Sequence, residues 1–249
     1  MNGVGSTGGL GWHLRALRYR RSLWAGYLTY TAQFLEDWSS QALQPAGVDQ
    51  LVVVGASAGW SLPPQWLRGF SAIMLIDPDP LAPWLFKRNH PLQSRQTRQW
   101  LRQTFESVLP ECLAARPQAA VLFNNLLGQL RLVSPDLDAT ERQLAQIRAS
   151  LMGRHWASFH DRLSGDWAQA QRSTPVLRAS GPIDNAALTK SFAKGGEWLD
   201  HLTSQVLPTN APRIIYPWRI TPDRLHVVEA GWVAPNQTLA SGPLEPDQA

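Results

Sequence analysis

The stretch LVVVGASAG, residues 51–59, joins a short apolar run to a loop of small residues. A continuous β-branched run of this kind suits a strand that is buried on both faces, as in a parallel sheet covered by helices. Glycine lets the loop after such a strand turn sharply and approach a ligand closely. The stretch therefore predicts an α/β fold with a ligand-binding loop at residues 55–59.

Strand and helix patterns alternate along the rest of the chain. Apolar runs predict strands at residues 72–76, 119–123, 174–179, 213–220 and 225–233. Apolar spacings of three and four residues predict helices at 19–38, 94–116, 138–163 and 184–206. This alternation predicts a doubly wound, three-layer α/β sandwich. Its sheet is mostly parallel and carries a C-terminal antiparallel hairpin strand.

Length and composition favour one compact domain. We expect a basic N-terminal segment at 1–18, a single α/β domain at 19–234 and a flexible C-terminal tail at 235–249. A hydrophobic content of 44% and a charged content of 17% exclude a disordered protein and a coiled coil. No apolar run approaches transmembrane length, and residues 1–21 lack a secretory pattern. The single cysteine, Cys112, predicts a reducing compartment, the cytoplasm.

Charge and aromatic content give weak guidance to a partner. The formal net charge is +4, and all but three of the basic residues are arginine. Arg15, Arg18, Arg20 and Arg21 form a dense cluster on a predicted helix, where nucleic acid or an acidic partner could bind, or which is simply a solvated face. No membrane partner is expected. The 12 tryptophans are scattered, which favours core and groove lining over a dedicated aromatic recognition site.

A second motif follows the predicted strand at 72–76, which ends at Asp77. Asp77 comes 22 residues after Gly55, close to the spacing at which an acidic side chain binds ribose hydroxyls in nucleotide-binding folds. The sequence Asp77-Pro78-Asp79-Pro80 also suits a plain turn. Ribose contact and turn formation both remain open for Asp77.

The order of these motifs resembles that of the class I S-adenosylmethionine-dependent methyltransferases. In that family a leading helix precedes the glycine loop, the second strand ends in an acidic residue, and a hairpin closes the sheet. The resemblance implies a methyltransferase that uses S-adenosylmethionine as cofactor and acts on an unidentified acceptor. It assigns cofactor contacts to Gly55, Ala56, Ser57, Gly59, Asp77 and Asp79. It matches the family's fourth strand and the catalytic loop that follows to residues 121–125.

The sequence also departs from the family pattern. Val53 and Val54 precede Gly55 where the family has an acidic residue, and Trp60 and the pair Pro63-Pro64 follow Gly59. No third strand is identified, and only residues 89–93 are available for it. These departures keep open a catalytically inactive, methyltransferase-like protein that binds a partner and has a blocked pocket beside Gly59.

Asn124, Asn125 and His160 are the candidate catalytic residues. The asparagines follow a predicted central strand, where an amide could orient an acceptor amine or hydroxyl, or could simply end the strand. His160 beside Asp161 could act as a base, but neighbours on a helix point about 100° apart, which favours a structural role on the helix surface. His155 and His160 are five residues apart, so no helical metal site is predicted.

Residues 55–59 also spell G-x-S-x-G, the nucleophile elbow of α/β-hydrolases. In this alternative Ser57 is the nucleophile, His226 the base, and Asp184 or Asp200 the acid. Only about 50 residues precede the motif, fewer than the strands before an elbow require. No glycine-rich oxyanion loop lies upstream, so the hydrolase ranks third.

Overall fold

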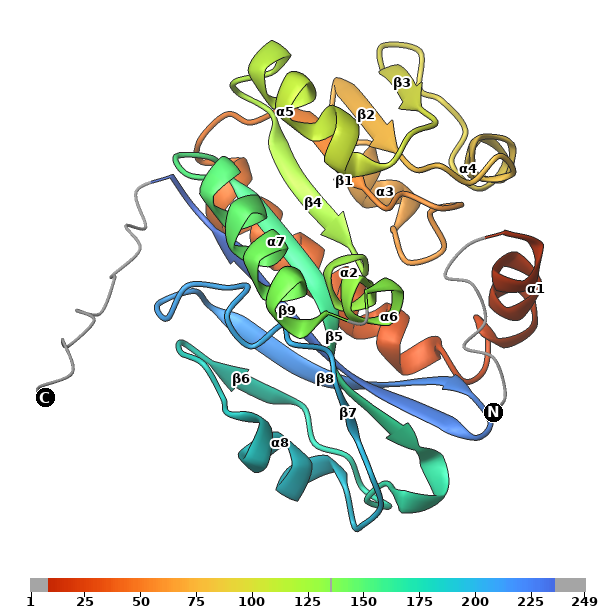
Figure 1. The fold of residues 1–249 in the computed structure, drawn as a ribbon. Coiled ribbons are helices and arrows are strands. Elements are labelled where there is room, and N and C mark those ends of the chain that lie inside the picture. Colours follow the sequence, from red (N-terminus) through yellow and green to blue (C-terminus); the bar gives the residue numbers. More distant parts are fainter. Residues whose placement is uncertain (1–8, 135, 236–249) are drawn as a thin grey trace, which may run out of the picture.

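The computed structural model describes residues 9–134 and 136–235, and its core is one mixed nine-stranded sheet (Figure 1). The path through the sheet runs β3-β2-β1-β4-β5-β9-β8-β6, and the short β7 pairs with β5 beyond the end of β4. The first five strands are parallel, whereas β9 runs antiparallel between β5 and β8. The strands are β1 (Gln50–Val54), β2 (Ala72–Ile76), β3 (Thr97–Leu101), β4 (Ala120–Asn124), β5 (Trp156–Asp166), β6 (Leu177–Ala179), β7 (Leu199–Asp200), β8 (Arg213–Thr221) and β9 (Arg224–Val233).

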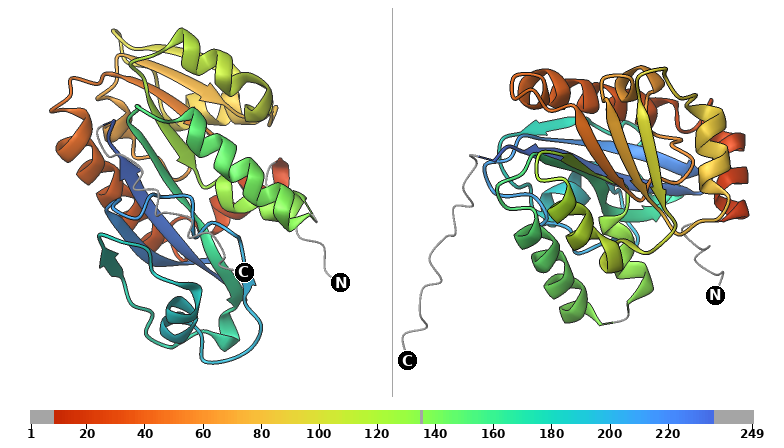
Figure 2. Two further views of the ribbon diagram at one scale, coloured as in Figure 1. Left: turned by 60° about the vertical axis from the view of Figure 1, so that its left-hand side comes forward. Right: turned by 90° about the horizontal axis from the view of Figure 1, so that it is seen from above.

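Helices cover both faces of the sheet, which confirms the predicted three-layer α/β class (Figure 2). One core lies under α1 to α4 and includes Phe34, Trp38 and Val53. The other lies under α5 to α7 and includes Val52, Phe123 and Leu144. The α-helices are α1 (Leu10–Tyr19), α2 (Ala25–Trp38), α3 (Pro64–Leu67), α4 (Ala82–Asn89), α5 (Phe105–Ala115), α6 (Leu130–Val133), α7 (Leu137–Ser150) and α8 (Asn185–Phe192), with single turns η1 (Ser39–Leu43), η2 (Leu127–Gln129) and η3 (Trp167–Gln169).

The predicted helix at 94–116 is wrong in its first half. That segment contains the missing third strand, β3, which pairs parallel to β2, and only α5 is helical. β3 is the edge strand of the sheet, and its residues are half-buried or exposed. An edge strand lacks the continuous apolar run that marks a central parallel strand, so the pattern gave no strand signal.

The predicted helix at 138–163 is also wrong beyond residue 150. Helix α7 ends at Ser150, and its N-cap is Asp136, whose carboxylate accepts a hydrogen bond from the Ala139 N–H. The following segment is β5, so His160 lies on a strand. Polar residues are buried in the middle of β5, so the segment lacks the apolar run of a buried strand. Its apolar residues had a spacing that also fits one face of a helix.

Several boundaries of the remaining segments move. The region 19–38 divides into the end of α1 and the separate helix α2, so the boundary proposed at residue 18 falls inside α1. Asp184 caps α8 as predicted, but the chain after it forms β7 and not more helix. The C-terminal hairpin, β8 and β9, is confirmed. The tail beyond residue 235 and the first eight residues lie outside the described residues. No helix among the described residues is long and apolar enough to cross a membrane.

Candidate functional site

A cavity of about 380 Å³ opens at the carboxyl ends of β1, β2 and β4. Open α/β sheets bind their ligands at this edge. The predicted residues that line it are Gly55, Ser57, Asp77, Asp79, Asn124 and Asn125. The structure therefore brings three separate sequence motifs to one cavity. Ala56, Gly59 and His160 lie outside its lining.

The glycine loop has a backbone that requires its glycines. Gly55 has a φ of 74°, and a Cβ there would lie 3.2 Å from the Cβ of Leu126. Gly59 has a φ of 66°, and a Cβ there would meet the His90 ring. The His90 side chain therefore fills the space beside Gly59, and His90 is not among the residues that line the cavity. Ala56 is fully buried under the loop, so its contribution is to loop shape.

Asp77 ties the glycine loop to the turn after β2. Its Oδ2 accepts a hydrogen bond from the Ser57 N–H at 2.7 Å, and its Oδ1 accepts one from the Asp79 N–H at 2.9 Å. Burial raises the pKa of this carboxyl, and the two backbone donors oppose that shift. Each carboxylate oxygen can accept a second hydrogen bond. Asp77 therefore serves the turn and still offers acceptors to a ligand in the cavity.

Asp79 holds α1 against the cavity. Its Oδ2 accepts hydrogen bonds from the Gly9 N–H at 2.7 Å and from His13 Nε2 at 3.0 Å. Trp60 Nε1 donates to His13 Nδ1, so the imidazole proton is on Nε2 and points to Asp79. Burial alone would raise the pKa of Asp79, but hydrogen bonds from the Leu81 and Gly9 N–H groups, with His13, hold it below its usual value.

We expect Asp79→Asn to release α1 from the domain. The substitution removes the charge that accepts these bonds, and hydrogen bonds to a charged group contribute about 1.5–3 kcal/mol. Trypsin should then cleave after Arg15 and Arg18 about tenfold faster than in the wild type. Asp49→Asn, at the opposite end of β1, is the matched control and should leave the cleavage rate unchanged. Equal rates in wild type and Asp79→Asn would contradict the tether.

An aromatic wall forms one side of the cavity. Its members are Trp12, Trp24, Tyr27, Trp60 and Trp218. The Tyr27 and Trp218 rings stack with centroids 4.3 Å apart, and the Trp12 and Trp24 rings lie 5.4 Å apart. Four of the tryptophans therefore line the groove, as their scatter predicted. Within the arginine cluster, Arg20 lies over the Trp60 ring at 5.2 Å.

The geometry around Ser57 lacks a base. Ser57 Oγ accepts a hydrogen bond from Trp12 Nε1 at 3.2 Å, and within the described residues no histidine bonds to it. His226 pairs with Asp161. Asp184 caps α8, and Asp200 bonds to Asn185 and Leu202. The three residues proposed for a hydrolase triad with Ser57 are thus engaged elsewhere.

The two asparagines after β4 have different environments. Asn124 is bonded at both ends of its amide, because its Oδ1 accepts from Ser61 Oγ at 2.6 Å and its Nδ2 donates to the Gly55 carbonyl at 2.6 Å. Asn125 has a φ of 53°, and its Oδ1 is buried without a hydrogen-bond partner among the described residues. Asn125 therefore offers a second free acceptor at the cavity, besides Asp77.

His160 belongs to a buried ionic network that joins β5, β9 and β8. Its Nδ1 lies 2.8 Å from Ser158 Oγ, and its Nε2 lies 3.4 Å from Glu229 Oε2. Arg162 and Arg213 each contact the Glu229 carboxylate at 2.9 Å. Burial would raise the pKa of Glu229, but His160 and the two guanidinium groups lower it to about 2. Sequence reasoning missed this network because its members come from three strands.

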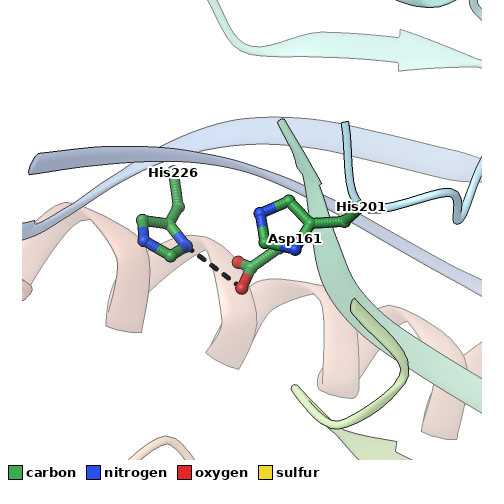
Figure 3. Close-up of side chains that lie close together, drawn as sticks. All are labelled: Asp161, His201 and His226. Carbon is green, nitrogen blue, oxygen red and sulfur yellow. Dashed lines mark ion pairs between the residues drawn. The ribbon is translucent and has the colours of Figure 1, made fainter. Parts of the chain in front are cut away.

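Sequence reasoning also missed a cluster formed by Asp161, His201 and His226 (Figure 3). His226 Nδ1 lies 3.0 Å from Asp161 Oδ2. Burial would raise the pKa of Asp161, but the nearby histidines, His226 first, hold it below its usual value. Burial lowers the pKa of His201. No local spacing reveals the cluster, since its residues are 25 to 65 positions apart.

Comparisons with known proteins return structures and no sequence families. No protein-family model matches the chain, and no curated protein matches it. The N-methyltransferase NodS from Bradyrhizobium japonicum WM9 is 12% identical, with a TM-score of 0.41 over 84% of this chain and 96% of that chain. Its complex with S-adenosyl-L-homocysteine is 11% identical, with a TM-score of 0.43 over 84% and 88%. A Burkholderia thailandensis 1,6-didemethyltoxoflavin-N1-methyltransferase is 14% identical, with a TM-score of 0.39 over 89% and 87%.

The topology itself carries the fold assignment. A glycine loop follows β1, an acidic residue follows β2, and the C-terminal hairpin inserts the antiparallel β9 beside β5. These features are those that the sequence resemblance led us to expect. The strand order and the C-terminal hairpin are therefore those of a class I S-adenosylmethionine-dependent methyltransferase-like fold.

Proposed function

We propose that the protein is an S-adenosylmethionine-dependent methyltransferase. The observation that carries the proposal is the cavity, which gathers the glycine loop, the acidic turn and the asparagine loop from the ends of β1, β2 and β4. Gly55 and Ser57 would bring backbone N–H groups to the cofactor, and Asp77 would accept the ribose hydroxyls. Asp79 would act by holding α1 in place beside the cavity, where α1 would cover the cofactor. Ala56 and Gly59 would shape the loop.

The chemistry of the proposed reaction needs few dedicated groups. S-Adenosylmethionine supplies an electrophilic methyl group when it is bound. The chain would hold the acceptor in line with that group and exclude water, and such positioning can account for several kcal/mol of the barrier. The free Oδ1 of Asn125 would accept a hydrogen bond from the acceptor. Asn124 would fix the distance between the two loops, because it bonds to Gly55. His160 does not line the cavity, so it would contribute only by stabilising β5, the strand that carries it.

An inactive partner-binding protein is less well supported. That alternative requires a blocked pocket, and His90 does fill the space beside Gly59. The cavity at Gly55, Ser57 and Asp77 is nevertheless open. A retained cavity with an aromatic wall and buried polar acceptors matches a site for a small molecule.

Tryptophan fluorescence tests the proposal. Because four tryptophans line the cavity, S-adenosylhomocysteine should change the emission in a saturable way. Trp24→Phe should reduce the amplitude of that change. Trp84→Phe is the matched control, since Trp84 is exposed outside the cavity, and should leave the amplitude intact. An unchanged spectrum at millimolar S-adenosylhomocysteine, with the protein folded, would contradict the proposal.

A further inference from the structure

The cluster of Asp161, His201 and His226 lies at a break in the pairing of β5. Strand β4 pairs with β5 as far as Phe159, and β7 pairs with it from Leu163 onward. Asp161 lies between these two partners. The register of β5 against β9 also shifts between Asp161 and Leu163. Irregularities of this kind re-aim side chains and are common next to functional sites.

The backbone closes tightly over Asp161 from one side. A Cβ on Gly128 would lie 2.8 Å from the Asp161 carbonyl oxygen and 3.0 Å from its Cβ. Only glycine fits there, so the turn η2 lies directly against the aspartate. The Gly128 carbonyl in turn contacts His201. Gly128 therefore links the loop after β4 to two members of the cluster.

Asp161 and His226 each carry a side-chain atom that has no hydrogen-bond partner among the described residues. Asp161 is 2% exposed, and its Oδ1 has no hydrogen-bond partner in the described part of the chain. His226 Nδ1 is 3.0 Å from Asp161 Oδ2, yet it also lacks a partner with hydrogen-bond geometry. A buried carboxylate oxygen without a partner is costly. A cation bound by Asp161 Oδ1 and His226 Nδ1 would give each of these two atoms a partner.

His201 is oriented as a metal ligand would be. Its Nδ1 lies 2.7 Å from the Gly128 carbonyl, which can only accept, so Nδ1 carries the proton. The lone pair is therefore on Nε2, which lies 3.0 Å from Ser164 Oγ. Histidine ligands in proteins usually donate their other ring N–H to a carbonyl or carboxylate in this way. Rotation of the Ser164 hydroxyl would free Nε2.

We propose that Asp161, His201 and His226 bind a divalent transition-metal ion, with zinc as the ion of choice. Two imidazoles and one carboxylate form a donor set typical of catalytic zinc sites, which keep a fourth position open. Ligand atoms around tetrahedral zinc lie about 3.3 Å apart, and the cluster's donor atoms lie within 4.8 Å of one another. The widest pair must close by up to about 1.5 Å, which side-chain rotation can supply.

The proposed ion would join three segments. Asp161 belongs to β5, His226 to β9, and His201 to the chain after β7. Binding to the folded state alone stabilises it in proportion to the logarithm of the ion concentration over Kd. The proposal does not depend on methyl transfer, so either proposal can fail without the other.

Metal uptake by the full chain, purified without a histidine tag and stripped with a chelator, tests the site. The protein should take up one Zn²⁺ per chain, with a rise in Tm. Co²⁺ in place of Zn²⁺ should give visible d–d absorption. His226→Gln and Asp161→Asn should each weaken Zn²⁺ binding by about 100-fold or more, because each removes a direct ligand. His155→Gln removes a histidine outside the cluster and should bind as the wild type does.

Two results would overturn the site. One is the absence of stoichiometric uptake by the wild-type protein. The other is uptake that is unchanged in both His226→Gln and Asp161→Asn. Circular dichroism checks the fold of each variant. Should Asp161→Asn not fold, His226→Gln and the wild-type titration decide the question, since the His226 side chain is 12% exposed and tolerates replacement more readily.

Discussion

Asp77→Ala should weaken the binding of S-adenosylhomocysteine by about 100-fold in a calorimetric titration. The loss has two sources. The variant removes a charged acceptor at the cavity, and hydrogen bonds to charged groups contribute about 1.5–3 kcal/mol. It also leaves the Ser57 and Asp79 N–H groups without their acceptor, so the glycine loop loses its tie to β2. A total of about 3 kcal/mol corresponds to the 100-fold change.

Two control variants separate these sources. Asp77→Asn keeps one carbonyl oxygen for a backbone N–H and loses the charge, so it should weaken binding by an intermediate factor. Asp49→Ala removes an exposed carboxylate at the opposite end of β1 and should change the affinity less than twofold. Wild-type affinity in a folded Asp77→Ala protein would contradict a role for Asp77 in binding.

Glu229→Gln should lower the free energy of unfolding at pH 7 by about 3–5 kcal/mol, the cost of leaving buried charge unpaired. Glu229 is fully buried, and its carboxylate pairs with both Arg162 and Arg213 through contacts of 2.9 Å. Neither guanidinium can deprotonate to escape the penalty. Urea unfolding measures the change. Glu36→Gln, on the exposed side of α2, should change the stability by less than about 0.5 kcal/mol.

The difference in free energy of unfolding between wild type and Glu229→Gln should depend on pH in a defined direction. The pKa of Glu229 is about 2 in the folded protein and 4.5 without the fold's influence. A carboxyl with a lowered pKa stabilises the fold fully above the unfolded value and loses that contribution as the pH falls. The stability gap between wild type and Glu229→Gln should therefore shrink as the pH falls from about 4.5 toward 2. A gap that stays constant over this range would contradict the role of the charge.

The sequence predicted the parts of the fold with strong local signals. The apolar runs that became β1, β2 and β4 are central strands, and the C-terminal hairpin carries its own turn. β3 was not predicted, because the residues of this edge strand are half-buried or exposed and form no continuous apolar run. β5 was taken for helix because its buried residues include His160, Asp161 and Arg162, whose burial depends on partners from other strands.

Some residues of the candidate site were predicted from local sequence signals, and others were not. Gly55, Ser57, Asp77, Asp79 and both asparagines follow predicted strands, and parallel strands bring their carboxyl ends to one edge. The tether of α1 to Asp79 and the pairing of Asp161 with His226 link residues 66 and 65 positions apart. Contacts over such distances depend on tertiary packing, which no local pattern encodes.

Calorimetric titration of the wild-type protein with S-adenosylhomocysteine shows whether the cavity binds the cofactor's demethylated product. We expect one site per chain with micromolar affinity, and loss of that affinity in Asp77→Ala. No heat of binding from a protein shown to be folded by its tryptophan emission would contradict a methyltransferase and leave a repurposed domain of the same fold.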